Sequence, residues 1–260
     1  MLTGIYRATM GMRAGLAVQD VIANNLANVS TAGYKRRIPV YEDIAAAALQ
    51  GEAPPRTPPA PVRPAELIIR DGVAEVTLSA TGVAAPTDRS QGEARYTGQK
   101  MDLCIQGPGF FVLEGPGGQR IYTRSGHFYR GPDGDLTSLQ GFRVLDDRER
   151  PINVDGGEIT VTEEGDVAVD GQIRGRLLIA DLVPGEGMQP VEGGFISQRP
   201  PVPASGYVVR QGYLETSNVN PVQEMVAMIS CMRAYEAAQR AISAADAALG
   251  KAVNEVGRLS

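Results

Sequence analysis

Two stretches with a helical spacing of apolar residues lie at opposite ends of the chain, and a strand-rich middle separates them. In the first, a seven-residue repeat runs from Ile5 to Val29. In the second, apolar residues recur at helical spacing from Val222 to Val256. Amphipathic helices of this length have an apolar face that needs a partner. We therefore expect the two helices to pair with each other or with the same helices of other copies.

The middle of the chain consists of short alternating or β-branched runs that are typical of strands. Asp-Gly and Gly-Asp pairs separate the runs, and GFFVLE-GPGG-QRIYTR at 109–124 is the clearest hairpin. The predicted class is α+β: long terminal helices paired as a coiled-coil-like bundle, and a central, mainly antiparallel β domain. The predicted divisions are an N-terminal helix over 1–44, an Ala/Pro-rich linker over 45–65, a β-rich domain over 66–216 and a C-terminal helix over 217–260.

Charge and hydropathy exclude several classes of protein. A net charge of −5 argues against binding nucleic acid through a general positive field. A membrane-spanning helix needs about 20 apolar residues in a row, and the chain has no such run. Arg7 and Arg13 interrupt the region where a secretory signal would be apolar. We expect a cytoplasmic protein, or one exported without a cleaved signal peptide and without direct membrane insertion.

Catalytic and metal-binding groups are scarce in the sequence. His127 is the single histidine, and nothing in the sequence brings it to Cys104 as base and nucleophile. One histidine and two distant cysteines, Cys104 and Cys231, supply too few ligands for a zinc site or for a disulfide framework. We therefore predict no catalytic residue, cofactor or metal, and we expect both cysteines to be free thiols.

The stretch NNLANVSTAGYKRR ends the first helical pattern in an unusual way. Asn24, Asn25 and Asn28 lie inside the pattern, although asparagine is a poor helix former. In one interpretation they only end the helix, followed by a turn over 30–33 and solvated cations. In the other, their amides contact neighbouring helices, and Tyr34 and the cations make a second contact after the turn.

Three segments resemble the rod and hook proteins of the bacterial flagellum. ANNLANVSTAGYKR at 23–36 is similar to the N-terminal signature of that family, and the segment at 211–249 is similar to its C-terminal signature. TGQKMDLCIQGPGFFVLE and RIYTRSGHF resemble its central β segment. Within the family, GYLE at 212–215 resembles the distal rod member. Pro221 and the stretch TDRSQGEARYTGQ resemble the proximal member, which we favour.

The resemblance implies a structural subunit of the basal-body rod, the axial drive shaft in the cell envelope. The terminal helices would form an inner tube around the export channel, and the β domain would form an outer layer. The implied partners are other copies, neighbouring rod and hook subunits, and the flagellar type III export apparatus. The predicted contact residues are Asn24, Asn25, Leu26, Asn28, Gly33, Tyr34, Asn218, Asn220, Met225, Ile229 and Tyr235. The alternative is a β-fold binding module or enzyme that forms a dimer through its terminal helices.

Overall fold

The computed structural model describes residues 2–41, 67–70, 73–76, 83–84, 86–182, 188–197 and 200–256. The chain divides into two compact units. The helical unit comprises residues 1–27, 37–87 and 220–260, and the β unit comprises residues 28–36 and 88–219. The predicted linker over 45–65 lies outside the described residues.

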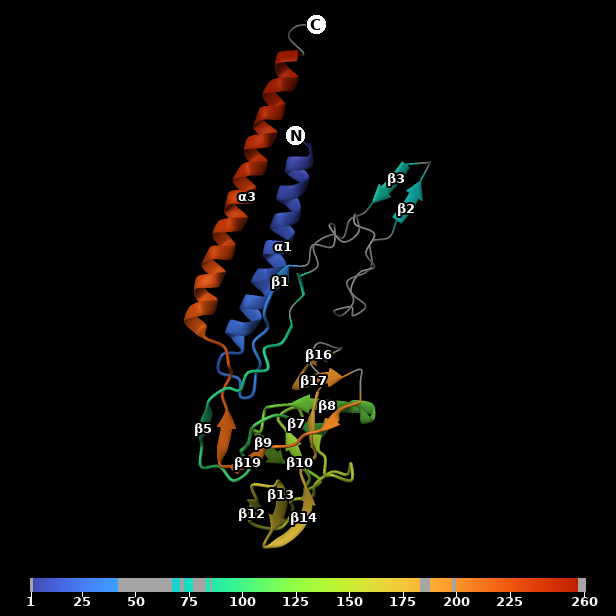
Figure 1. The fold of residues 1–260 in the computed structure, drawn as a ribbon, viewed down its shortest axis with the longest axis vertical. Coiled ribbons are helices and arrows are strands. Elements are labelled where there is room, and N and C mark those ends of the chain that lie inside the picture. Colours follow the sequence, from blue (N-terminus) through green and yellow to red (C-terminus); the bar gives the residue numbers. More distant parts are fainter. Residues whose placement is uncertain are drawn as a thin grey trace. The chain divides into compact units, whose positions relative to one another are not determined.

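A helix near each end of the chain is confirmed, but the N-terminal helix ends at Ala27, and the described residues 28–41 of the predicted 1–44 segment are not helical. Helix α1 spans Leu2–Ala27 and helix α3 spans Pro221–Val256, so the N-terminal helix is the shorter, with 26 residues against 36. The two lie side by side in Figure 1. They run antiparallel, because Asn25 of α1 hydrogen bonds to Glu224 of α3, whereas the earlier Gly15 accepts a bond from the later Cys231.

The buried line of α1 is displaced from the predicted seven-residue stripe. The most buried side chains of its described part are Ala14, Val18, Val21, Ile22 and Asn25. Of these, only Ile22 belongs to the predicted stripe, whose other members from Met12 to Val29 are half-buried. The side chains before residue 11 lie outside the described set. A one-residue rotation of the buried face therefore places Asn25, rather than Leu26, against the neighbouring elements.

Helix α3 has two apolar faces. Along one line, residues spaced alternately by four and three positions are buried or half-buried: Glu224, Met228, Cys231, Tyr235, Ala238 and Ile242. Glu224 and Cys231 on this line bond to α1, so this face packs on α1. The other face, here called the α3 stripe, consists of Val222, Met225, Val226, Ile229 and Met232, which are 48–67% exposed. An exposed apolar row of this length in a single chain indicates a contact surface.

The described residues of the helical unit also form two short antiparallel pairs. Strand β1 (Val40–Tyr41) pairs with β4 (Val83–Ala84), and β2 (Leu67–Arg70) pairs with β3 (Val73–Val76). The Asp-Gly sequence at 71–72, which lies outside the described residues, separates β2 from β3 in the chain.

The β unit is built from short strands whose described pairs are all antiparallel. The largest sheet has the order β16-β17-β8-β7-β11-β10-β9, and β15 joins β7 to β18. A second sheet has the order β12-β13-β14, and β19 pairs with β6 and β20 with β5. The mainly antiparallel β region predicted from the sequence is thereby confirmed. The strands are β5 (Ala94–Tyr96), β6 (Leu103–Gln106), β7 (Phe110–Glu114), β8 (Arg120–Thr123), β9 (Phe128–Arg130), β10 (Leu136–Ser138), β11 (Arg143–Val144), β12 (Ile159–Val161), β13 (Asp166–Val169), β14 (Gln172–Arg176), β15 (Ile179–Asp181), β16 (Met188–Val191), β17 (Gly194–Ser197), β18 (Val202–Pro203), β19 (Val208–Gln211) and β20 (Tyr213–Glu215).

The β7–β8 hairpin organises the core of the β unit, as its sequence predicts. Its strands are joined by a short 3-10 turn, Pro116–Gly118. Strand β7 is buried on both faces: Phe111 and Leu113 enter one apolar cluster, and Phe110 and Val112 enter a second. Successive side chains of a strand point to opposite faces of the sheet. Strand β7 therefore lies between the two apolar clusters.

Candidate functional site

The predicted contact residues of the helical unit begin with Asn25, whose side chain is fully buried. Its amide donates to the Arg37 carbonyl at 2.8 Å and to Glu224 Oε2 at 3.1 Å, and it accepts the Arg37 N–H at 2.9 Å. Asn25 therefore ties the end of α1 both to the chain that follows the turn and to the start of α3. Asn25 therefore has a structural role within the single chain, because its buried amide pairs with donor and acceptor groups of other segments.

The other residues of the asparagine-rich stretch lie nearer the surface. Asn24 is exposed, and Leu26 and Asn28 are half-buried. Asn28 Oδ1 accepts a hydrogen bond from the Thr31 hydroxyl at 3.2 Å, and the backbone carbonyl of Asn28 accepts the Thr31 N–H. The two bonds form a local turn. Tyr34 is half-buried and closes the next turn with its N–H on Thr31 O. Their contacts with neighbouring subunits remain predictions.

Asn220 follows the last residue of the β unit and is the N-cap of α3. Its side-chain oxygen accepts the N–H groups of Val222 and Gln223 at 3.1 and 3.2 Å, and Pro221 occupies the first helical position. Met225 and Ile229 belong to the exposed α3 stripe, whereas Tyr235 is half-buried on the line that faces α1. These positions are therefore divided between two faces of one helix.

Residues 28–36 of the β unit are here called the strap. They bond to the segment at 215–218, which precedes α3 in the chain. The N–H of Gly33 donates to Glu215 O at 2.8 Å, and the N–H of Arg36 donates to Asn218 Oδ1 at 2.7 Å. The Asn218 amide donates in turn to Asp88 O and to Ser90 O, each at 3.1 Å. Gly33 and Asn218, both predicted contact residues, thus hold together segments that are far apart in the sequence.

The strap ends in a buried ionic cluster, here called the Glu215 hub (Lys35, Arg124 and Glu215). The Glu215 carboxylate accepts bonds from Lys35 Nζ at 2.5 Å, from the Gly92 N–H at 3.0 Å and from Arg124 Nη1 at 3.3 Å. Lys35 Nζ also donates to Ser90 O at 2.7 Å. The three charged side chains are at most 5% exposed.

Burial dominates the electrostatics of the hub. It lowers the pKa values of the Lys35 ammonium and the Arg124 guanidinium, and Glu215 opposes both shifts through hydrogen bonds and charge. Charges removed from water need such partners, because removing one partner of a buried ion pair costs about 3–5 kcal/mol. The interpretation of Lys35 as a solvated cation is therefore wrong. The sequence offers one signal for the hub, a glutamate at the end of the apolar run that precedes α3, and this signal is weak.

The histidine and the two cysteines occupy separate environments. His127 Nδ1 lies 2.5 Å from Asp102 Oδ1, and its Nε2 contacts the Tyr129 hydroxyl. Cys104 is buried and its thiol contacts Ile105 O at 3.8 Å, whereas both ring nitrogens of His127 contact other side chains, Asp102 and Tyr129. Both cysteines are free thiols, as expected. Burial raises the pKa of the Cys104 thiol to about 11 and so suppresses the thiolate that a nucleophile requires.

The Cys104 pKa leads to a prediction about alkaline stability. The thiol of the unfolded chain ionises near pH 9, whereas the folded one holds its proton to about pH 11. The contribution of Cys104 to the free energy of unfolding should therefore fall between these two pH values, by at most about 2.7 kcal/mol at 1.36 kcal/mol per pKa unit, and this contribution should be constant below pH 9. Cys104→Ala should remove this fall in urea titrations at pH 7, 9 and 11.

The matched control for Cys104→Ala is Cys231→Ala, because Cys231 is only half-buried and lies in the helical unit. The difference between wild type and variant cancels the opposite contribution of Lys35, whose lowered pKa makes stability rise with pH below 10.5. Equal pH slopes for wild type and Cys104→Ala would contradict the assignment.

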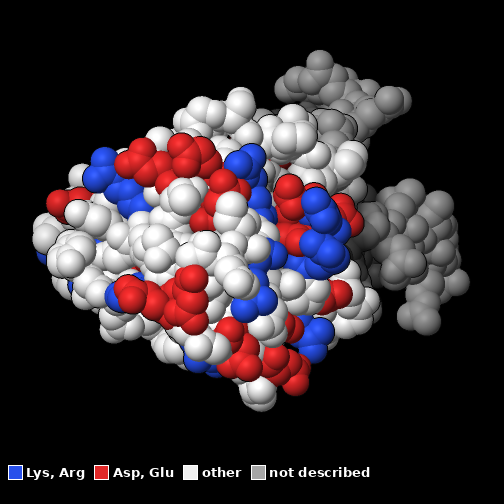
Figure 2. All heavy atoms as spheres, turned by 90° about the horizontal axis from the view of Figure 1, so that it is seen from below, with Lys and Arg blue, Asp and Glu red and all other residues white. Residues whose placement is uncertain are grey.

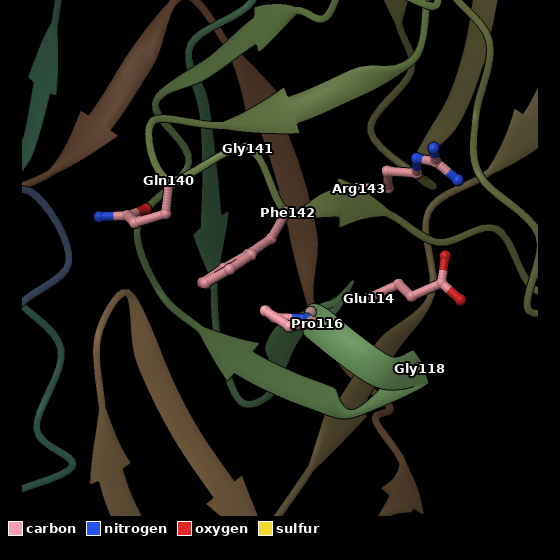
Figure 3. A pocket seen from close by; sticks show the side chains of 8 residues that line it. Glu114, Pro116, Gly118, Gln140, Gly141, Phe142 and Arg143 are labelled. Atoms are coloured by element: carbon pink, nitrogen blue, oxygen red, sulfur yellow. The ribbon is translucent and has the colours of Figure 1, made fainter.

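A shallow pocket beside the β7–β8 turn is lined by Glu114, Gly115, Pro116, Gly118, Gln140, Gly141, Phe142 and Arg143. In Figure 3 the Glu114 and Arg143 side chains extend to the same side, away from the Phe142 ring, and the two residues are cross-strand partners in β7 and β11. The charged and apolar parts of the lining are therefore separate. Within the described residues no group of three or more His, Cys, Asp and Glu could hold a metal ion. The face in Figure 2 shows Lys and Arg interspersed with Asp and Glu.

Comparison with known proteins gives a consistent result along the chain. Residues 5–35 match the family described as "Flagella basal body rod protein". Residues 104–169 match "Flagellar hook protein FlgE/F/G D1 domain", and residues 210–255 match "Flagellar basal body rod FlgEFG protein C-terminal". Among the described residues no helix has the length and apolar character to cross a membrane.

Two relatives represent the two types of rod protein. The flagellar basal-body rod protein FlgG of Agrobacterium fabrum is 35% identical, over 92% of this chain and 94% of its own. The flagellar basal-body rod protein FlgF of Caulobacter vibrioides is 34% identical, over 93% and 92%. Similarity of this extent defines the class as structural proteins of the flagellar axis. The chain belongs to the family of flagellar basal-body rod proteins and is of the FlgF/FlgG type.

Proposed function

We propose that the chain is a structural subunit that polymerises through its terminal helices into the axial shaft of the basal body. The inner tube around the export channel would contain residues 1–44 and 217–260, and residues 66–216 would form the outer part. Its partners are other copies and neighbouring rod and hook subunits. Passage through the flagellar type III apparatus, without a cleaved signal peptide, belongs to the same proposal. We assign it no catalytic, nucleic-acid-binding or cofactor-dependent role.

The α3 stripe carries the proposal. Helix α3 already packs one face on α1, and yet five apolar side chains of the stripe stay about half-exposed. A second apolar face that α1 does not cover needs another molecule. Neighbouring subunits in a rod would cover the stripe in every copy. A symmetric dimer would cover it as well, so the stripe supports assembly and the experiment below separates the two kinds of assembly.

Asn24 and Asn25 form a matched pair for the experiment. The two residues differ in burial, because Asn24 is exposed and Asn25 is fully buried. Asn24→Ala should leave the purified subunit folded but reduce the yield of basal bodies, because each lost contact with a neighbour costs about 1–3 kcal/mol. Asn25→Ala should instead lower the free energy of unfolding of the isolated subunit by a similar amount. Immunoblots of isolated basal bodies and urea titrations measure the two effects, with secretion assayed separately.

The experiment also separates the proposal from its alternative. A binding module or enzyme dimerised by these helices would purify as one dimeric species and would be absent from basal bodies. Absence of the wild-type chain from isolated basal bodies would overturn the proposed function. Normal basal-body yield with Asn24→Ala would remove only the role assigned to Asn24.

A further inference from the structure

The strap is continuous in sequence with α1, and yet its partners lie in the β unit. Gly33, Lys35 and Arg36 bond to Glu215, Ser90 and Asn218, and Arg36 O accepts the Asp88 N–H at 2.7 Å. Gly33 and Lys35 are buried in the single chain. The strap therefore obtains its burial and these hydrogen bonds without a second subunit.

The helices differ from the strap in this respect. The α3 stripe remains exposed in the single chain, so burial of this face requires another molecule. The strap is held by a buried ionic cluster that is complete within one β unit. Intramolecular contacts form at any protein concentration, whereas contacts between subunits form only on assembly.

We infer that the strap folds with the β unit before assembly and acts as a preformed clamp on the chain that leaves α1 and the chain that enters α3. The inference rests on the proposed function for the meaning of assembly. It places residues 28–36 with the β unit, although the sequence divisions assign them to the inner-tube helix. Lys35 is then a positioning residue, because its ammonium joins the strap to Glu215.

The clamp has a consequence for helix pairing. Gly33 follows α1 closely and Asn218 precedes α3 closely, and the strap fixes the backbone at both positions. With the strap seated, α1 and α3 are joined by two short tethers, which corresponds to an effective concentration on the order of millimolar. With the strap released, the strap residues lengthen the tether to α1, so the helices should meet less often.

Hydrogen exchange of the purified full-length subunit, followed by mass spectrometry, tests the inference. In the wild type, amides of the strap should exchange at least about 100-fold more slowly than in an unstructured peptide, because Gly33 and Arg36 are bonded. Lys35→Met should accelerate exchange in the strap at least about tenfold and leave the β7–β8 hairpin unchanged. Lys100→Met is the matched control, because Lys100 is exposed and its ion pair with Glu158 lies at the surface.

A second variant keeps the test valid if Lys35→Met unfolds the whole subunit. Asn218→Ala removes the acceptor of the Arg36 N–H but leaves the hub intact, and it should also accelerate exchange in the strap. Rapid exchange of the wild-type strap in the free subunit would overturn the inference, as would equal protection in Lys35→Met and Lys100→Met. Because the readout comes from the free subunit, the inference and the proposed function can fail separately.

Discussion

Ile229→Asp should abolish incorporation of the subunit into the rod and leave the purified subunit folded. Ile229 is 52% exposed in the single chain, so the new carboxylate stays in water there, and the lower helix propensity of aspartate costs only about 0.7 kcal/mol or less. Packing the α3 stripe against a neighbour would bury that charge without a partner, at about 3–5 kcal/mol per subunit by analogy with broken buried pairs. Circular dichroism tests whether the purified subunit is folded. Immunoblots of isolated basal bodies and a swimming assay test whether it is incorporated into the rod.

The matched control for Ile229→Asp is Ala241→Asp. Ala241 is exposed on the same helix but lies about 120° around the helix axis from Ile229, away from the face of the α3 stripe. The two variants introduce the same charge into α3, so a difference between them reports the surroundings of the charge rather than the helix itself. Normal swimming of cells with Ile229→Asp would show that the stripe is not a packed contact.

Gly33→Ala should strongly destabilise the subunit and release the strap. Gly33 has a φ of +68°, and an added Cβ would lie 2.3 Å from the backbone of both Arg124 and Ser125. The left-handed conformation costs about 1–2 kcal/mol for alanine, and overpacking adds about 1–3 kcal/mol, so we expect a loss of roughly 2–5 kcal/mol. Urea titration at neutral pH measures the free energy of unfolding.

Gly141→Ala separates the two causes of the Gly33 effect. Gly141 has a φ of +82°, and no atom lies within 4 Å of its added Cβ, so only the backbone contribution of about 1–2 kcal/mol should appear. A Gly33→Ala variant that is no less stable than Gly141→Ala would contradict the close packing of the strap.

Local sequence patterns predicted the elements well. The α1 and α3 helices, the β7–β8 hairpin and the cap at Asn220 all follow from apolar spacing, turn residues and a capping side chain within a few positions. The family signatures at the two ends and in the middle identified the class of protein. In each case the information lies within one short segment, because helix and strand formation depend on neighbours in sequence.

The orientation of faces was predicted less well. Both helices were recognised, but the buried line of α1 passes through Asn25 rather than Leu26, and α3 presents Ile229 to the outside and Tyr235 to α1. A helix with apolar residues on two faces has no single direction of amphipathicity. Which face meets α1 depends on the shape of the partner, and a single-sequence pattern does not contain that shape.

By itself the sequence determined the order and type of the elements, the absence of a recognisable catalytic motif and the family. The tertiary structure alone decided the partners of the polar residues. Lys35 follows a surface-like turn in the sequence, but it is buried on Glu215, and Asn25 bonds to Glu224 from the other end of the chain. A cation or amide is stable in a buried position only when a complementary group is there to receive it. That group lies 180 residues away in the sequence for Lys35 and 199 residues away for Asn25, so its identity becomes visible only when the chain is folded.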